Sequence, residues 1–354
     1  MSKFRDSKFS SLKEYVPGEQ PQDKKYIKLN TNESPFPPSP LVISSVNADE
    51  VSKLNLYSDP ECKILKETVA DRYGVKTENV FLSNGSDEIL NFAFMLYGNV
   101  NGTIFPDISY GFYKVFGDLY NIDYEAIPLT ESFEINPEDY KGKNKFVVIA
   151  NPNAPTGIAL SLDVIEDIIR SNPDNVVLID EAYVDFGAES ALSLIDKYNN
   201  LLVCRTYSKS RSLAGARLGF GFASKELIGD LELIRNSTNP YNINRLTQIA
   251  GTAAIKEDEY YMNACKEIQK VREYTKDELI KLGFEVLPSK ANFLFAKHDS
   301  IDGNDLYLKL KDKGVLVRHF TSERICQFNR ITIGTKEQMD IFLDTVKNIM
   351  EEEK

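Results

Sequence analysis

The chain has 354 residues, a length that allows two domains and a large buried core. Its hydrophobic content of 42% and its charged content of 27% are typical of a globular protein. The formal net charge is −11, from 42 basic and 53 acidic side chains, which argues against a general affinity for nucleic acid or for an anionic membrane.

Residues 1–40 are rich in proline and polar side chains, as in the run Pro-Phe-Pro-Pro-Ser-Pro at residues 35–40. This composition predicts an extended arm laid over another surface. Residues 41–270 then alternate strand and helix patterns, and we expect them to form one large domain.

Four apolar runs in this region each lead into a polar turn. Continuous apolar runs separated by helical patterns indicate a mostly parallel sheet covered by helices on both faces. Ligands of such sheets bind beyond the carboxyl ends of the strands, so we expect the four turns to meet at one crevice. The runs are residues 80–82, 146–150, 176–179 and 201–204, and a helical pattern at residues 89–97 follows the first turn.

The last part of the chain, residues 271–354, is predicted to be a smaller α/β domain. A long helical pattern over residues 257–282 leads into strand-like runs at residues 284–286, 292–296 and 330–333, for which we expect antiparallel pairing. A hinge near the long helix would let this domain close over a substrate. The predicted units are therefore an arm at 1–40, a large domain at 41–270 and a small domain at 271–354.

The turn after residues 201–204 carries Ser208, Lys209 and Arg217. A lysine at the end of a buried strand can form a Schiff base, and a serine hydroxyl with an arginine can hold a phosphate beside it. A solvated loop is the alternative for this segment taken alone. The combination suggests pyridoxal phosphate as the cofactor.

Two other turns offer groups that such a cofactor needs. Asp180 can pair with the pyridine nitrogen and keep it protonated, or it can be a helix N-cap. Tyr183 can hydrogen-bond the ring hydroxyl, or it can pack as a partly buried aromatic residue. Gly85, Ser86 and Asp87 lie where a helix begins, so they can cradle a phosphate, or a serine or aspartate there can simply cap the helix.

Seven stretches, in order along nearly the whole chain, resemble the histidinol-phosphate aminotransferase branch of the fold type I pyridoxal-phosphate enzymes. A match to one motif is common by chance, whereas an ordered series is specific. The stretches are Leu-Asn-Thr-Asn-Glu-Ser-Pro (29–35), Tyr-Ser-Asp-Pro (57–60), Ser-Asn-Gly-Ser-Asp-Glu (83–88), Asn-Pro-Asn-Ala-Pro-Thr-Gly (151–157), Asp-Glu-Ala-Tyr (180–183), the segment 205–217, and Arg-Ile-Thr-Ile-Gly (330–334).

This resemblance implies roles for individual residues around the cofactor. Lys209 would be the Schiff-base residue, Asp180 would face the pyridine nitrogen and Tyr183 would face the ring hydroxyl. The remaining cofactor contacts that it implies are Gly85, Ser86, Asp87, Ser208 and Arg217 around the phosphate, and Tyr110 stacked on the ring.

The resemblance also implies how the substrate and a second subunit are bound. Tyr57 would reach the phosphate of the neighbouring subunit's cofactor, so we expect a homodimer with shared active sites. Arg330 and Arg318 would grip the anionic tail of the substrate, since the planar guanidinium pairs with carboxylate or phosphate oxygens. Either arginine would otherwise suit a solvated edge strand. Tyr15 and Asn32 are further candidates for the substrate pocket.

The chain departs from the family pattern in two places. Ala154 stands before Pro-Thr-Gly where the family has an asparagine whose amide approaches the ring hydroxyl. Either Tyr183 would then hold the hydroxyl alone, or Asn153 would turn inward. After the lysine, residues 210–212 are Ser-Arg-Ser, where relatives more often carry small or aromatic residues. Arg211 would point outward, or it would favour a further anionic group on the substrate.

Three functions fit these observations. The first is a transaminase that moves an amino group between glutamate and histidinol phosphate or an aromatic amino acid. The second is a decarboxylase of the threonine-phosphate type, because related enzymes share most cofactor contacts. The third is a protein that keeps the cofactor fold without turnover, which the retention of the reactive lysine and its neighbours argues against.

Cysteine and histidine usage points to no metal site. The cysteines lie far apart without a C-x-x-C pair, so neither a disulfide framework nor a zinc site is predicted. Free thiols, an N-terminus without an apolar run, and no apolar run of about eighteen residues make the cytoplasm the expected location. The residues concerned are Cys62, Cys204, Cys265, Cys326, His298 and His319.

Overall fold

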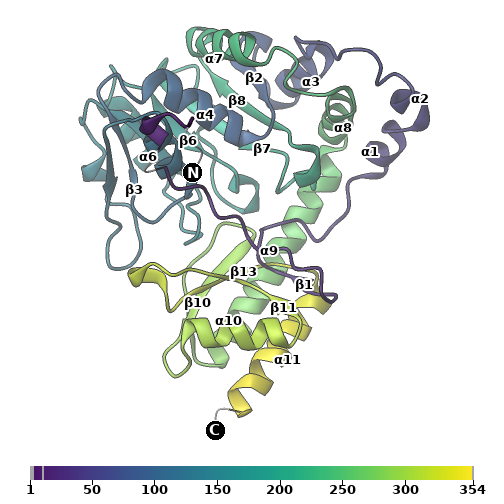
Figure 1. Cartoon of the computed structure of the whole chain (residues 1–354), viewed down its shortest axis with the longest axis vertical. Coiled ribbons are helices and arrows are strands. Elements are labelled where there is room, and N and C mark those ends of the chain that lie inside the picture. The colour runs from purple at the N-terminus through teal and green to yellow at the C-terminus, as the bar shows by residue number, and fades with distance from the viewer. Residues whose placement is uncertain (1–3, 10–11, 353–354) are drawn as a thin grey trace.

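The computed structural model describes residues 4–9 and 12–352. Within these ranges, a larger part is built round a seven-stranded sheet and a smaller part round a four-stranded sheet. Helix α9 (Asp258–Lys281) runs from one part to the other (Figure 1). The predicted fold class, a mostly parallel sheet covered by helices together with a smaller C-terminal α/β unit, is confirmed.

The strands of the large sheet are, in chain order, β2 (Val80–Ser83), β3 (Thr103–Pro106), β4 (Tyr124–Ile127), β5 (Phe146–Ala150), β6 (Val177–Asp180), β7 (Leu201–Thr206) and β8 (Gly219–Ala223). They lie in the order β2-β8-β7-β6-β5-β3-β4. Neighbours are parallel except for β8, which is antiparallel to both β2 and β7. Because β2 and β7 both oppose β8, the carboxyl ends of β2, β5, β6 and β7 lie at the same edge of the sheet.

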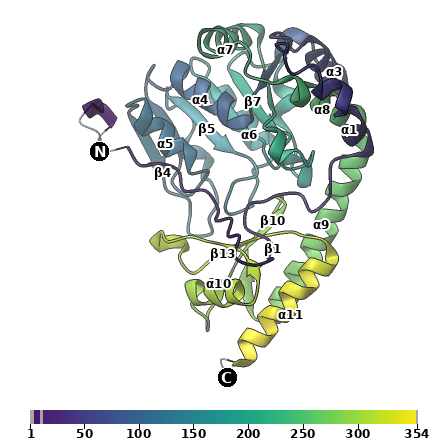
Figure 2. The same ribbon diagram turned by 45° about the vertical axis from the view of Figure 1, so that its right-hand side comes forward.

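Both faces of this sheet are buried, which explains why its strands read as continuous apolar runs. Successive residues of a strand point to opposite faces. In β5, Val147 and Ile149 belong to the core on one face, and Val148 belongs to the core on the other. The first face is covered by α3 (Lys63–Tyr73), α6 (Leu162–Ser171) and α8 (Arg245–Lys256), and the second by α4 (Ser86–Tyr97), α5 (Phe112–Leu119) and α7 (Lys225–Thr238) (Figure 2).

The smaller part has an antiparallel sheet in the order β12-β13-β10-β9. Its strands are β9 (Phe284–Val286), β10 (Phe293–His298), β12 (Arg318–His319) and β13 (Asn329–Thr332). Helices α10 (Gly303–Asp312) and α11 (Lys336–Glu352) pack against it, and α11 lies beside α9 (Figure 2). Residues from α9, the sheet and α11 share one apolar core, for example Cys265, Leu294 and Phe342.

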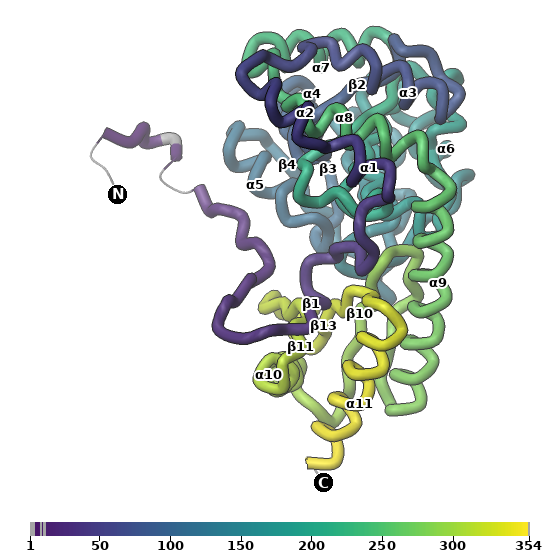
Figure 3. The backbone as a smooth tube through the Cα atoms, turned by 90° about the vertical axis from the view of Figure 1, so that its right-hand side faces the viewer, coloured from purple at the N-terminus to yellow at the C-terminus, as the bar shows by residue number. Residues whose placement is uncertain are grey.

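The N-terminal segment joins the smaller part before the chain enters the larger one. Figure 3 shows it standing away from the body and returning to it at β1 (Ile27–Lys28), which pairs in parallel with β11 (Val315–Leu316). Glu19 contacts Tyr307 and Lys311 on α10. The chain then forms α1 (Pro40–Ser45) and α2 (Ala48–Val51) beside α8.

Two element boundaries differ from the predicted ones for clear reasons. The helix predicted at residues 89–97 begins at Ser86, because Gly85 adopts a φ of 77° and Glu88 accepts a hydrogen bond from the Asn84 amide at 2.7 Å. The strand predicted at residues 201–204 continues to Thr206, so the buried Arg205 lies inside it. None of the helices in the described ranges has both the length and the apolar composition of a membrane span.

Candidate active site

A cavity of about 770 Å³ lies where the carboxyl ends of the β5, β6 and β7 strands meet the smaller part and the N-terminal segment. The segment Lys13–Gly18 forms part of its wall. The cavity brings together most of the residues that the sequence singled out. Those on its wall are Tyr15, Asn32, Ser86, Asp87, Tyr110, Asp180, Tyr183, Ser208, Lys209, Arg217, Arg318 and Arg330.

Three of the predicted residues do not line the cavity. Gly85 lies directly behind Arg217, and a Cβ atom added to it would stand 2.8 Å from Arg217 Nη2. The Asn153 side chain is buried against the loop that follows β3, where it donates to the Ile108 carbonyl at 3.0 Å and accepts the Ser109 hydroxyl at 2.7 Å, so it does not line the cavity. Tyr57 is 80% exposed and stacks on Tyr241, with 4.5 Å between ring centroids.

Lys209 presents a primary amine to the cavity from the loop after β7. Its Nζ donates a hydrogen bond to the Thr31 carbonyl at 3.1 Å and lies 5.9 Å from the centre of the Tyr183 ring. Burial, and secondly the Arg330 cation, lowers the pKa of Lys209 to about 8. About half of this amine is therefore neutral, and nucleophilic, at pH 8.

Asp180 ends β6 as a buried carboxylate. It accepts a hydrogen bond from the Tyr113 hydroxyl at 2.9 Å and one from the Ala182 amide at 3.2 Å. Burial raises the pKa of Asp180 to about 6. The following 3-10 helix has Tyr183, not Asp180, at its N-cap. The carboxylate is thus free of a helix-capping role, and a cation on the cavity side would stabilise its ionised form.

Tyr183 and Asn32 meet beside this carboxylate. The Asn32 side chain donates to the Tyr183 hydroxyl at 2.8 Å, and the Tyr183 ring meets Phe293 edge to face at 5.1 Å. Asn32 also holds Thr332 of β13 through its backbone and side chain, at 3.0 Å in each case. The phenol therefore has a fixed position between the two parts of the molecule.

The start of α4 and the loop before β8 form a polar hollow in the cavity wall. Arg217 Nη2 lies 3.1 Å from Asp87, whose carboxylate also accepts the Tyr110 hydroxyl at 2.8 Å. Gly219 lets β8 pass so close to α4 that a Cβ atom there would lie 2.5 Å from the Ser86 amide nitrogen. A helix N-terminus and a guanidinium thus meet at one point, as anion sites require.

Arg318 and Arg330 stand opposite each other on β12 and β13, so their side chains share one face of the small sheet. Arg330 donates to the Asn30 carbonyl at 3.0 Å, while its Nε has no hydrogen-bond partner in the described part of the chain. Burial lowers the pKa of Arg330 below its ordinary value. Arg318 donates to the carbonyls of Val16 and Pro17 at 3.0 and 3.1 Å.

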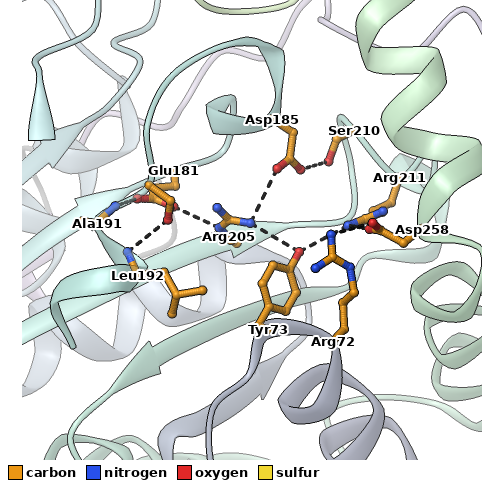
Figure 4. Close-up of polar contacts among 11 residues, drawn as sticks. Arg72, Tyr73, Glu181, Asp185, Ala191, Leu192, Arg205, Ser210, Arg211 and Asp258 are labelled. Carbon is orange, nitrogen blue, oxygen red and sulfur yellow. Dashed lines mark hydrogen bonds and ion pairs between the residues drawn. The ribbon is translucent and has the colours of Figure 1, made fainter. Parts of the chain in front are cut away.

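Sequence reasoning missed Tyr113, and the position that it favoured for Arg211 is wrong. Tyr113 lies in α5, is 0% exposed and gave no signal beyond being one aromatic residue among many. Arg211 does not point outward, because its side chain is only 1% exposed, and it does not line the cavity. It lies 2.5 Å from Asp258, in a buried group of charged residues behind the cavity (Figure 4).

The comparisons with known proteins agree with this geometry. The sequence model described as aminotransferase class I and II matches residues 24–346. A histidinol-phosphate aminotransferase of Brachyspira hyodysenteriae is 51% identical over 352 residues, covering 99% of each chain, and one of Clostridium botulinum is 48% identical over 351 residues, again covering 99% of each.

Among solved structures, a histidinol-phosphate aminotransferase of Sinorhizobium meliloti in complex with pyridoxal-5'-phosphate is similar in fold. Its TM-score is 0.86 at 22% identity, with 99% of each chain covered. A family match over most of the chain and two relatives near half identity over almost their whole length leave one conclusion: this chain is a member of the class I and II aminotransferase family.

Proposed function

We propose that the chain is a pyridoxal-phosphate-dependent aminotransferase that exchanges an amino group between glutamate or 2-oxoglutarate and histidinol phosphate or its keto form, imidazole acetol phosphate. Two relatives of nearly the same length carry the name histidinol-phosphate aminotransferase. The observation that carries the proposal is the meeting of an amine of lowered pKa, a buried carboxylate and an underpartnered arginine in one cavity. These groups are Lys209, Asp180 and Arg330.

The residues on the cavity wall fit the cofactor. Two glycines leave room at the start of α4 that a Cβ atom would fill, which suits the close approach of a phosphate to backbone amides. Lys209 would form the covalent bond, and Asp180 would pair with the ring nitrogen. When bound, the cofactor supplies a ring that accepts electrons from the reacting carbon. Further contacts would come from Ser86, Asp87, Ser208 and Arg217 to the phosphate, Tyr110 to the ring face, and Tyr183 to the ring hydroxyl.

The side chains of the protein then divide the work. The Lys209 amine would hold the proton that leaves one carbon of the substrate and return it to another. Asp180 would stay ionised beside the protonated ring nitrogen, since that cation would offset the effect of burial. The Tyr183 phenol, held by a hydrogen bond from Asn32, would face the ring hydroxyl.

Two arginines support an anionic substrate. The net charge of −11 repels anions in general, so attraction must be local. Arg330 and Arg318 share one face of the small sheet and both line the cavity. A phosphate monoester has enough oxygens to meet both guanidinium groups in pairs. Tyr15 and Phe320 offer aromatic surfaces beside them for an imidazole ring.

A second copy of the chain is proposed to cover an exposed apolar face formed by residues 43–64. Five side chains there are between 48% and 68% exposed, namely Ile43, Val51, Leu54, Leu56 and Ile64. Several exposed large apolar side chains within one segment favour a protein interface. Tyr57 lies in the same segment, 80% exposed, and is proposed to reach the cofactor phosphate of the second subunit. Size measurement of the purified protein in solution tests the dimer.

The unit boundaries and the location are proposals of the same kind. The division into 1–40, 41–270 and 271–354 puts its second boundary inside α9, whose residues share a separate apolar core with the elements that follow it. A cytoplasmic location is supported by the four cysteines, which are free thiols in the structure.

The function is tested with a panel of amino donors and 2-oxoglutarate. We expect histidinol phosphate to be the best donor, ahead of tyrosine and phenylalanine, and we expect the purified protein to be yellow. Lys209→Ala should lose the colour and lower turnover by about 10⁴-fold or more, because it removes both the covalent anchor and the base. A yellow and active Lys209→Ala would contradict the cofactor assignment. Release of carbon dioxide from threonine phosphate without a keto acid would show a decarboxylase instead.

A further inference from the structure

Polar contacts of Ser210 and Arg211 tie the segment that carries Lys209 to the protein body, among them a hydrogen bond at 3.3 Å from Arg211 Nη2 to the Tyr73 hydroxyl (Figure 4). The Ser210 hydroxyl donates to Asp185 at 2.6 Å. Arg211 Nη2 lies 2.5 Å from Asp258 Oδ1. Neither Ser210 nor Arg211 lines the cavity, so both act on the lysine through the backbone.

Arg211 is an unusual anchor because it is almost completely buried. Its side chain is 1% exposed, its guanidinium lies 5.6 Å from the centre of the Tyr261 ring, and its Nε and Nη1 have no hydrogen-bond partner in the described residues. A buried ion pair of this kind adds little net stability, since the desolvation of both charges offsets their attraction. The ion pair instead restricts the position of the Arg211 side chain, because a buried guanidinium with a single carboxylate partner is stable only beside that partner.

That carboxylate belongs to the helix that joins the two parts of the molecule. Asp258 is the first residue of α9, which runs from the large sheet into the smaller part (Figure 1). Further along α9, Arg272 donates to the Phe186 carbonyl at 2.9 Å and to the Ala291 carbonyl at 2.8 Å. The lysine segment is therefore fixed to an element that the smaller part also holds.

We propose that Arg211 is a positioning residue, whose ion pair with Asp258 holds the Lys209 segment against the start of α9 and so fixes where the amine stands in the cavity. The inference rests on the proposed function, in which Lys209 is the reactive amine. It gives the buried cation two positions after the lysine a function.

Loss of the Arg211 side chain should raise the pKa of Lys209. Burial is the largest cause that lowers the pKa of Lys209 to about 8, and the Arg330 cation follows it. Arg211 does not belong to the charges that shift this pKa most. Its removal therefore acts through position: a looser segment lets water reach the amine, and the pKa rises towards its ordinary value.

The test compares Arg211→Met with Arg72→Met. Arg72 Nη2 lies 2.5 Å from the other oxygen of Asp258, but Arg72 is on α3, its side chain is 40% exposed, and no hydrogen bond or ion pair joins it to the lysine segment in the described residues. Each variant thus removes one cation from the same carboxylate. The readouts are the pH midpoint for acetylation of Lys209 in the full chain after removal of the cofactor, measured on peptides, and kcat and KM of the loaded enzyme.

We expect Arg211→Met to raise the acetylation midpoint and to lower kcat by about ten- to a hundredfold with KM nearly unchanged, because small misplacements of a reacting group have effects of this size. Arg72→Met should leave both readouts as in the wild type. If the two variants behave alike, or if Arg211→Met changes only the melting temperature, the positioning role is wrong.

A second variant decides the matter if Arg211→Met does not fold. Asp258→Asn keeps the shape and removes the charge, and it should shift both readouts in the same direction by a smaller amount. A folded Asp258→Asn with wild-type midpoint and kcat would overturn the proposal. Failure of the wild type to bind the cofactor or to transaminate would instead contradict the proposed function, so the two failures are distinguishable.

Discussion

Charged side chains are buried in two neighbouring regions of this protein, and the pKa shifts in the two regions have different causes. On the cavity wall, burial lowers the pKa of Lys209 to about 8, raises that of Asp180 to about 6 and lowers that of Arg330. Behind the cavity, burial alone would lower the pKa of Arg205 and Arg211, yet nearby anionic groups raise it.

In the group behind the cavity, which we call the balanced group, positive and negative side chains pair with one another. Arg205 donates to Glu181 at 2.9 Å and lies 3.6 Å from Asp185, and its guanidinium stands 5.2 Å from the centre of the Tyr73 ring (Figure 4). Glu181 also accepts the Ala191 amide at 2.6 Å. Each charge in this group has its partner within the chain, whereas no ion pair is formed within the described residues by Lys209, Asp180 or Arg330 on the cavity wall.

This contrast separates groups that act on a ligand from groups that hold the scaffold. An unpaired buried charge destabilises the folded state, so substitutions on the cavity wall should leave stability unchanged or improved while they impair binding. Substitution of Arg205 in the balanced group, whose partners are Glu181 and Asp185, should lower the stability of the fold and leave binding unchanged. Three variants test this difference.

The largest effect is expected for Arg205→Met. Met fills a similar volume, but the substitution leaves the buried Glu181 carboxylate without its cation. Breaking one side of a buried pair destabilises a protein by about 3 to 5 kcal/mol. We expect a loss of this order in chemical unfolding at pH 8. The loss should shrink below pH 5, because removing the cation raises the pKa of Glu181 still further and the protonated acid needs no partner.

The matched control is Lys197→Met. Lys197 pairs with Glu166 on the surface, and its side chain is 62% exposed. An exposed pair contributes about 1 kcal/mol or less. If Arg205→Met is no more destabilising than Lys197→Met, the balanced group does not hold the scaffold and the contrast fails.

A smaller effect of the opposite sign is expected for Asp180→Asn in the cofactor-free protein. The folded-state pKa of Asp180, about 6, lies above the ordinary value of 3.8, so the folded state binds this proton more tightly than the unfolded chain does. The stability that this proton provides is present below pH 4 and is lost as the pH rises through 6. Asparagine does not ionise, so the variant should be more stable by about 1 to 3 kcal/mol at pH 8 and no more stable at pH 4.

With cofactor bound, the same substitution should be harmful, because the ring nitrogen loses its carboxylate. Melting temperatures at pH 4 and pH 8, with and without pyridoxal phosphate, measure both effects. A variant that is less stable than the wild type at pH 8 without cofactor would show that Asp180 already has a sufficient partner in the protein.

The sequence predicted the cavity wall well and the balanced group poorly. Lys209, Asp180 and Arg217 follow apolar runs, and the carboxyl ends of the strands that lead to them meet at one edge, so their meeting follows from the topology. Arg205 also follows an apolar run, but it lies inside β7, and its partner Glu181 is the residue directly after the neighbouring strand β6. One strand pattern does not reveal which charge a neighbouring strand supplies.

Two further differences have similar causes. Asn153 was a candidate partner for the ring hydroxyl of the cofactor, because Ala154 cannot fill that role. Its side-chain amide instead donates hydrogen bonds to the Ile108 carbonyl and the Thr156 hydroxyl, at 3.0 and 3.1 Å. Tyr113 comes from α5, where nothing in the helical pattern marks one buried aromatic residue as a hydrogen-bond donor. Side-chain partners set by packing between elements are the part that sequence patterns leave open.

The smallest effect is expected for Tyr113→Phe, which removes the hydroxyl that donates to Asp180 at 2.9 Å. This hydrogen bond opposes the effect of burial, so its loss should raise the pKa of Asp180 further above about 6. The carboxylate would then be protonated over more of the neutral range and would pair less well with the ring nitrogen. A lost hydrogen bond of this kind is worth about 0.5 to 1.5 kcal/mol, so cofactor affinity near pH 7 should fall by about tenfold at most.

The control for this variant is Tyr207→Phe. Tyr207 is also 0% exposed, but its hydroxyl has no hydrogen-bond partner in the described residues, so its removal should leave cofactor affinity unchanged. Affinity is measured by titrating the cofactor-free protein with pyridoxal phosphate between pH 6 and 9. The deficit of Tyr113→Phe should narrow as the pH rises, because a carboxyl with a raised pKa is still fully ionised at high enough pH. A deficit that does not depend on pH, or one that Tyr207→Phe shares, would mean that the hydroxyl supports packing and not the charge of Asp180.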